Sequence, residues 1–435
     1  MGRLPDSTVG TAQTDPISWE TLTALVDCAP RMAGSAGERA AMDELAERFR
    51  ALGARDVSVD SFEIAAWERG ESTLSVPERS AEYDGDHQVI GLPGTPSGTV
   101  SGRVVDVGHG TPAEFDEQSV EGALVIVAGG TPESYDRWFH RREKYELAVE
   151  RGADGFLFQS RRDGCLPPTG DIGDGDPPGE IPGVGISREV GRRLARYASD
   201  GTTEAELTVD CGTEPGTSGN VSARLGPDTD RELWLTAHHD AHDIADGALD
   251  NGCGCALVTE VARLLATVED DLETAVRLTT FGAEEVGLLG STRAAEEHAL
   301  SEITAVLNLD GIGSTRNLAV DTHGFPAIAE AFEQAADSHD VPVEIRERVN
   351  THSDHWPFAR EGVPAAMAYS TGGSDRRGWG HTHGDTLDKL DSRDLRALAV
   401  PIAEAVLELA SGERSTERVS PDTVLERARE EGYDV

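Results

Sequence analysis

The chain has 435 residues and a formal net charge of −42, because 80 acidic residues face only 38 basic ones. This length predicts two or three domains of ordinary size. The charge argues against nucleic acid and against an anionic membrane as partners, since both would repel the protein. No run of about 18 apolar residues predicts a transmembrane helix, and the polar N-terminus shows no Sec-type signal peptide. We therefore expect a cytoplasmic protein.

The basic residues are almost all arginine. Only Lys144 and Lys389 are lysines, and the acidic residues are spread along the whole chain. A hydrophobic share of 38% is too high for a disordered acidic protein. The composition resembles that of salt-adapted proteins, whose surface repulsion is screened because the Debye length is about 3 Å in 1 M salt. We interpret the charge as an adaptation to a halophilic solvent and not as the sign of a cationic partner.

The five cysteines are odd in number and lack CxxC spacing, so a disulfide framework is not expected. Two interpretations remain open for Cys253 and Cys255. They could form a metal or redox pair, or they could be small buried residues at the start of a helix. We favour the second interpretation.

The N-terminal half changes in character along its length. Residues 1–15 are polar and turn-rich, which predicts a flexible arm. Residues 17–53 carry apolar side chains at helical spacing and predict a helix. Between 85 and 205, Gly, Pro and Asp are frequent, and short β-like runs surround one helix near 135–151. This segment is predicted to be a smaller, β-rich inserted domain.

From Leu233 onward, apolar strand-like segments alternate with helical ones. Strands are predicted at 233–237, 275–281, 303–309, 343–347 and 365–369, and helices at 256–266, 291–298, 326–338 and 392–410. This alternation predicts an α/β fold with a doubly wound, mostly parallel sheet, in which ligands bind at the carboxyl ends of the strands.

The domain organisation follows from these segments. Residues 16–84 and 206–412 form one discontinuous catalytic domain, interrupted by the insert at 85–205. Residues 413–435 are charged and weakly helical, and they are predicted to form a surface tail.

Side chains that can bind metal follow the predicted strands or precede a helix at five places. Such positions converge on one crevice in this fold class. Imidazoles and carboxylates suit zinc, a pair of ions needs a bridging carboxylate, and a further carboxylate can take a proton from water. An isolated Glu pair in so acidic a chain would be a solvated surface pair, so the joint pattern carries the prediction. Its members are His238, Asp240, Asp250, Glu284, Glu285, Asp310, His381 and His383.

Several segments occur in the order of a known family. They are AHHD, GALDNGCG, FGAEEVGLLGS, NLDGIG, SDHWPFAREGVPA and HTHGDTLDKLD. They resemble the co-catalytic zinc exopeptidase family of bacterial leucyl aminopeptidase, aminopeptidase Y and plasma glutamate carboxypeptidase, over roughly 205–412. The segment AVERGADGFLF in the insert resembles the protease-associated domain that many members carry.

The resemblance implies a metallopeptidase that hydrolyses terminal peptide bonds, most simply an aminopeptidase with two Zn²⁺ ions, which Co²⁺ or Mn²⁺ could replace. It implies that Glu284 is the general base and that Asp240 orients His238. One metal would be held by His238, Asp250 and Asp310, and the other by Asp250, Glu285 and His381. His383 is the rival of His381 for the last position.

The sequence also departs from the family pattern. Gly380 stands where many members have Tyr, and His239 stands where Tyr is common. The group that stabilises the oxyanion is left open among Tyr369, His355 and Trp379, and His242 is either an extra ligand or a pocket residue.

Other functions remain possible on the same sequence. They are a carboxypeptidase or dipeptidase, a glutaminyl-cyclase-like acyltransferase, and a metal-free binding relative. The insert either covers the cleft or mediates association, such as homo-oligomer formation, and it need not touch the metals.

Overall fold

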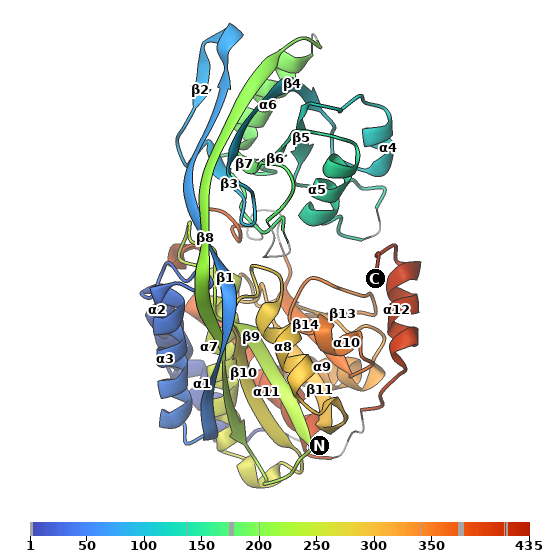
Figure 1. Ribbon diagram of the computed structural model, residues 1–435. Coiled ribbons are helices and arrows are strands. Elements are labelled where there is room, and N and C mark those ends of the chain that lie inside the picture. The colour runs from blue at the N-terminus through green and yellow to red at the C-terminus, as the bar shows by residue number, and fades with distance from the viewer. Residues whose placement is uncertain are drawn as a thin grey trace.

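The computed structural model describes residues 3–135, 137–173, 178–199, 201–339, 341–372, 378–412, 414 and 416–435. Within these residues one continuous sheet runs through both parts of the molecule, in the order β13-β12-β14-β11-β9-β10-β8-β4-β5-β6-β7-β3. Figure 1 shows a larger α/β domain at the bottom and the insert above it, joined by two long strands.

Four parallel strands form the centre of the larger domain. They are β10 (Ala275–Phe281), β9 (Glu232–His238), β11 (Ile303–Leu309) and β14 (Ala365–Ser370). Antiparallel neighbours flank them, β8 (Glu204–Leu225) on one side and β12 (Leu318–Asp321) on the other, and β13 (Val343–Arg346) pairs in parallel with β12. The central strands are almost entirely buried, as their continuous apolar runs require.

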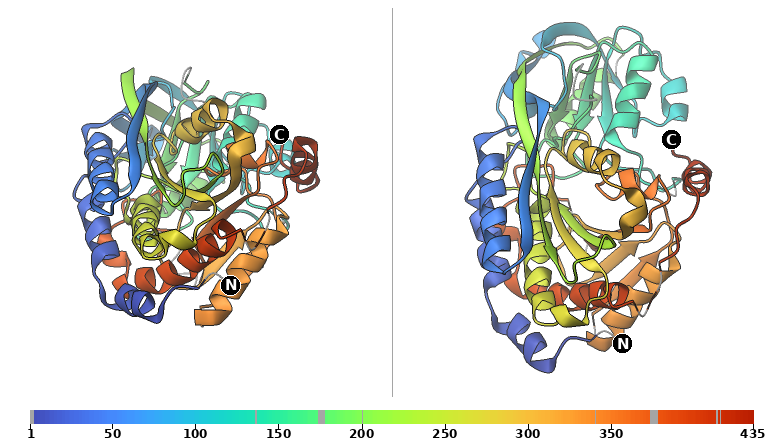
Figure 2. Two further views of the ribbon diagram at one scale, coloured as in Figure 1. Left: turned by 90° about the horizontal axis from the view of Figure 1, so that it is seen from below. Right: turned by 60° about the horizontal axis from the view of Figure 1, so that its bottom comes forward.

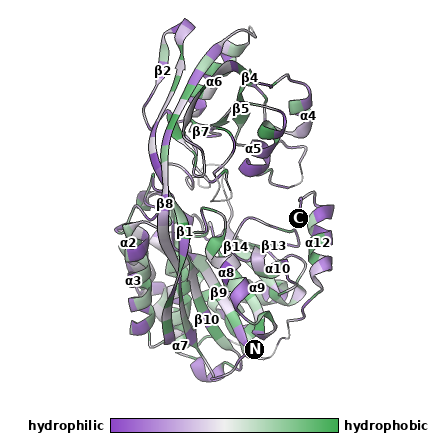
Figure 3. Cartoon of the chain, in the orientation of Figure 1, coloured by the Kyte–Doolittle hydropathy of each residue, from purple (hydrophilic) through white to green (hydrophobic). Residues whose placement is uncertain are grey.

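Helices cover both faces of this sheet (Figures 1 and 2). On one side α7 (Cys253–Ala266) packs against α11 (Ser392–Ala410), which also contacts α9 (Pro326–His339), while α8 (Leu289–Glu297) packs against α10 (Trp356–Ala359) on the other side. The α/β prediction is confirmed, and β10, β11 and α11 have the predicted bounds. Figure 3 shows hydrophobic residues gathered in the strands of the central sheet, with hydrophilic residues on the outer helices.

The insert is a small α/β unit. Its strands β4 (Gly98–Asp106), β5 (Leu124–Ala128), β6 (Gly155–Gln159) and β7 (Gly183–Ile186) run parallel, and β3 (Val89–Gly91) pairs antiparallel with β7. Separate hydrophobic clusters line the two faces of this sheet. Its helices are α4 (Pro112–Asp116), α5 (Arg141–Glu150) and α6 (Arg188–Ala198).

Two strands of 22 residues cross from the larger domain into the insert. They are β1 (Arg55–Val76) and β8 (Glu204–Leu225), which pair antiparallel along most of their length, and β2 (Ala81–Tyr83) pairs with the far end of β1. The chain thus enters and leaves the insert through a β-ribbon and not through flexible linkers. The ribbon couples the two parts of the molecule mechanically.

The N-terminal segment is ordered, in contrast to the predicted flexible arm. Residues Asp6–Thr14 form α1, and Leu4 and Ala12 are buried in the main core. The single helix expected over 17–53 is also wrong. It is divided into α2 (Ile17–Val26) and α3 (Ala36–Ala51), because Pro30 lacks a backbone N–H and Gly34 adopts φ +85° in the intervening turn.

The C-terminal segment is also ordered and packed on the core, in contrast to the predicted surface tail. Helix α12 (Pro421–Glu430) buries Val424 and Ala428, and Tyr433 beyond it packs on the main core. Residues 1–2 of the predicted arm, and 413 and 415 of the predicted tail, lie outside the described residues. No helix in the described part of the chain is both long enough and apolar enough to cross a membrane.

Candidate metal centre

The predicted ligands come together at the carboxyl ends of the central strands. His238 is the last residue of β9, and Asp310 directly follows β11. Glu285 lies in the turn after β10 and Asp250 lies in the short turn before α7. His381 comes from the loop after β14, where its backbone adopts φ +58°. A left-handed φ in a residue other than Gly costs about 1–3 kcal/mol and needs support from its surroundings.

Two groups of donor atoms share the Asp250 carboxylate. The Nε2 atom of His238 lies 3.3 Å from Asp250 Oδ1 and 3.6 Å from Asp310 Oδ1. The Nε2 atom of His381 lies 3.3 Å from Asp250 Oδ2 and 3.3 Å from Glu285 Oε2. The two oxygens of Asp250 therefore face two different histidines, as a bridging carboxylate would.

The donors fit divalent metal ions. Within the described part of the chain, His238 Nε2 and Glu285 Oε1 are buried without a hydrogen bond. The donor atoms of His238, Asp250 and Asp310 lie within 4.8 Å of one another. Buried polar atoms that lack partners are costly unless a ligand satisfies them, and imidazole with carboxylate is the donor set that zinc accepts.

Asp240 holds His238 and the Glu pair in place. The Nδ1 atom of His238 lies 3.2 Å from the Asp240 carbonyl oxygen and 3.4 Å from its Oδ1. The same carboxylate accepts hydrogen bonds of 3.1 Å from the backbone N–H groups of Glu284 and Glu285. Burial opposes ionisation of Asp240, but the hydrogen bond and charge of His238, together with His239 and the backbone N–H of Glu285, outweigh it, so the pKa of Asp240 is lowered. Such outer contacts leave Nε2 free to face a metal.

Glu284 has the character of a proton acceptor. Its Oε2 lies 3.9 Å from His238 Nε2. Burial raises the pKa of Glu284 well above its usual range; His238 favours the anion and the neighbouring Glu285 opposes it. A raised pKa makes this carboxylate a stronger base than an exposed one, as the acceptor of a proton from water requires.

The structure separates the two candidate histidines of the last motif. Both nitrogens of His383 face backbone carbonyls, Nδ1 at 2.9 Å from Ile244 and Nε2 at 3.1 Å from Asp86. His381 is the one that faces Asp250 and Glu285. His242 also belongs to this side of the centre, because its Nε2 lies 2.9 Å from Glu285 Oε2.

One carboxylate and one serine hold the proposed ligands Asp250 and Asp310 in place. Asp385 accepts hydrogen bonds from the backbone N–H groups of Leu249, at 2.7 Å, and Asp250, at 3.0 Å. Burial raises the pKa of Asp385 to about 7. Ser353 donates to Asp310 Oδ2 at 2.5 Å and accepts from Asn308 at 2.8 Å. Ser353 lies within the SDHWPF segment, so its neighbourhood carried a signal although no role was assigned to it.

A buried arginine, which the sequence analysis missed, holds the backbone beside two ligands. Arg31 donates to the carbonyl oxygens of His239 at 2.9 Å, Asp246 at 2.6 Å and Gly247 at 2.9 Å. Its side chain is 1% exposed. Arg31 thereby ties the segment after His238 to the segment before Asp250.

The three groups named for the oxyanion have other partners. The Tyr369 hydroxyl donates to Asp321 Oδ1, and His355 Nε2 lies 3.1 Å from His323 Nε2. The Trp379 ring lies beneath the Arg162 guanidinium. None of the described contacts brings these three side chains to the metal donors, so the oxyanion group stays unassigned.

The cysteines take no part in the donor groups. All five are free thiols, and Cys253 and Cys255 are buried at the start of α7, as favoured from the sequence. The Cys255 thiol donates to the His238 carbonyl oxygen at 3.0 Å.

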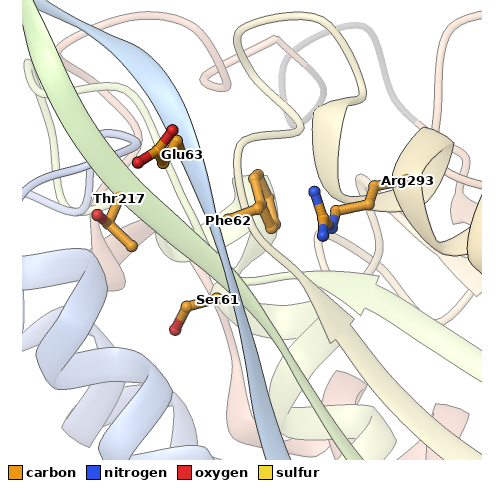
Figure 4. Close-up of a pocket in the computed structure, with 5 residues that line it drawn as sticks. All are labelled: Ser61, Phe62, Glu63, Thr217 and Arg293. Carbon is orange, nitrogen blue, oxygen red and sulfur yellow. The ribbon is translucent and has the colours of Figure 1, made fainter.

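Two cavities differ in chemistry. One is a small pocket at the metal donors, lined by His242, Asp250, Glu285 and His381 among others. The other is an open hollow at β1 and α8, where Arg293 faces the ring of Phe62 (Figure 4). The hollow contains none of the metal donors, so the first pocket is the candidate active site.

Comparison with known proteins agrees with this geometry. Residues 220–406 match Peptidase family M28, and residues 100–194 match the PA domain. Aminopeptidase YwaD of Bacillus subtilis is 27% identical over 421 residues, which cover 93% of this chain and 86% of that protein.

Solved structures share the whole architecture. The aminopeptidase from Aneurinibacillus sp. strain AM-1 has a TM-score of 0.71 at 25% identity, covering 96% of this chain and 97% of its own. A zinc aminopeptidase from Bacillus subtilis has a TM-score of 0.70 at 25% identity, covering 92% and 95%. The chain is therefore a metallopeptidase: its residues 220–406 are similar to peptidase family M28, its insert is similar to the PA domain, and the named relatives are aminopeptidases.

Proposed function

We propose that the chain is an aminopeptidase that removes N-terminal residues from peptides with two zinc ions, which Co²⁺ or Mn²⁺ could replace. One observation carries the proposal: the two oxygens of Asp250 face His238 and His381 at 3.3 Å each. His238, Asp250 and Asp310 would hold one ion. Asp250, Glu285 and His381 would hold the other, with His242 as a further donor.

The side chains around the proposed ions have separate roles in the reaction. Bound divalent ions supply Lewis-acid polarisation of the scissile carbonyl group and lower the pKa of water. Glu284 takes a proton from the attacking water and then delivers it to the amine of the leaving group. Asp240 fixes the orientation of His238 through its backbone carbonyl and its carboxylate, and the same carboxylate holds the backbone of Glu284. Asp385 and Ser353 hold the backbone of Asp250 and the carboxylate of Asp310.

Exchange of the proposed base tests the reaction. Glu284→Gln keeps the shape of the side chain but removes its basicity, so kcat should fall by about 10²–10⁴-fold. Metal content, measured by atomic absorption, should stay at the wild-type value because Glu284 is not among the proposed ligands. Glu296→Gln changes an exposed residue of α8 and should leave kcat unchanged. Full activity of Glu284→Gln would contradict the assignment of Glu284 as the general base.

A substrate panel tests the terminal specificity. We expect cleavage of aminoacyl substrates with a free α-amine and none of the matching N-acyl forms, because the named relatives are aminopeptidases. The reverse preference would identify a carboxypeptidase, and cyclisation of an N-terminal glutamine would identify an acyltransferase. A chelator should abolish activity and added Zn²⁺ should restore it.

A further inference from the structure

The insert contacts the last proposed ligand directly. Thr169, in the segment between β6 and β7, donates its backbone N–H to the carbonyl oxygen of His381 at 2.8 Å. The carbonyl oxygen of Thr169 lies 3.3 Å from His381 Nδ1. Thr169 is fully buried and lies inside the matched PA domain. The backbone of Thr169 therefore contacts both the backbone and the imidazole of the ligand.

The contact with Thr169 restrains His381, whose own packing restrains it less than His238. The side chain of His381 is 31% exposed, against 1% for His238, so packing restrains it less. Its backbone also has the left-handed φ of +58°. A carbonyl oxygen at Nδ1 selects the tautomer in which Nε2 faces the metal, which is how outer partners orient histidine ligands.

Arg69 on β1 anchors the Thr169 segment to the larger domain. Its guanidinium donates to both carboxylate oxygens of Asp243, at 2.8 and 2.6 Å, and to the Thr169 hydroxyl at 3.1 Å. It also donates to the carbonyl oxygen of Gly91 and stacks on Trp67. Asp243 adjoins His242, so one arginine joins the ribbon, the insert and the segment after β9.

We propose that Arg69 and Thr169 are positioning residues for His381, and that the insert thereby sets the affinity of the second metal position. The inference rests on the proposed two-metal function and extends it to a role for the PA domain. The insert then supports the metal centre through Thr169. Loss of this support should weaken one metal and leave the other, which is held by His238 and Asp310.

This role is tested by titrating Zn²⁺ into the metal-free full chain and measuring the affinity of each binding step by calorimetry. His381→Ala identifies the step that belongs to the second position. Arg69→Met should weaken that same step by about 10–100-fold, the usual effect of removing an outer partner, and leave the other step unchanged. Thr169→Val keeps the volume and the backbone contacts but loses the hydroxyl, so it should weaken the same step by a smaller factor. It also provides the test if Arg69→Met does not fold.

Arg137→Met is the matched control. Arg137 also makes a bidentate ion pair, with Glu143, and it donates to the carbonyl oxygen of Gly432 across the domain junction. In the described structure it does not contact Thr169 or His381. It should leave both steps unchanged. The inference is overturned if Arg69→Met and Thr169→Val change neither step or both steps equally, or if Arg137→Met weakens the second step as much. A wild-type chain that binds one ion would instead overturn the proposed function itself.

Discussion

Gly380, which directly precedes the proposed ligand His381, leaves room for the carboxylate of Asp250. A Cβ atom on Gly380 would lie 3.0 Å from Oδ2 of Asp250. A side chain there would push the carboxylate that faces both histidines. The Tyr that the family pattern has before its last histidine does not fit this position without a shift of Asp250. The departure noted in the sequence is therefore tied to the packing against the proposed bridge.

Ser353 gives a prediction at the same scale. Ser353→Ala removes the donor to Asp310 and the acceptor of Asn308, both in the buried interior. We expect Zn²⁺ affinity to fall by about 10–100-fold and the metal-free protein to lose about 1–3 kcal/mol because a buried group is left unpaired.

Both quantities can be measured, by competition with a chelator dye and by urea unfolding. Ser187→Ala is the control, since Ser187 is equally buried and caps α6 in the insert. It should reduce stability without changing metal affinity. Equal metal affinity in Ser353→Ala and the wild type would contradict the positioning of Asp310 by Ser353.

At the scale of elements, the two terminal helices complete the larger domain. Helix α1 contacts α7 and α11, and Leu4 donates its N–H to Glu404. Beyond α12, Tyr433 lies under the Arg137 guanidinium and Gly432 accepts from the same group. The C-terminal segment therefore touches the insert as well as the core, and a charged composition did not keep it at the surface.

Helix α12 supplies a stability prediction. Val424→Asp places an unpaired charge at a fully buried position, so unfolding free energy should fall by about 3–5 kcal/mol. Glu426→Ala, on the exposed side of α12, should be close to neutral. Thermal unfolding followed by circular dichroism checks both. An unchanged melting temperature for Val424→Asp would mean that α12 is undocked in solution.

At the scale of the whole molecule, the β1–β8 ribbon makes the insert and the larger domain one continuous sheet. The charge of −42 acts at the same scale. We propose that it serves salt tolerance. Lowering KCl from about 1 M to 0.1 M lengthens the Debye length from about 3 to 10 Å and exposes the surface carboxylates to mutual repulsion.

The expected result is a marked fall in the melting temperature and in activity at low salt, with the metal content per chain unchanged. KCl is the proper salt because sulfate strengthens burial by exclusion from any protein surface. A melting temperature that does not depend on KCl would contradict salt adaptation. Loss of metal at low salt would show that the charge also acts on the site.

The sequence by itself determined the α/β architecture and the family resemblance, because apolar periodicity and residue type at strand ends are local properties. It also named the donors that the structure gathers around Asp250, which are His238, Glu285, Asp310 and His381, although their roles as ligands stay predictions. Only the tertiary structure decided that His381 and not His383 faces the centre, since both lie in one short motif. It alone joined Arg31, Ser353 and Thr169 to the site. These contacts run between distant segments. Each contact that Arg31 or Thr169 makes to the ligand segments uses a backbone atom on at least one side, and backbone atoms leave no signature in residue type.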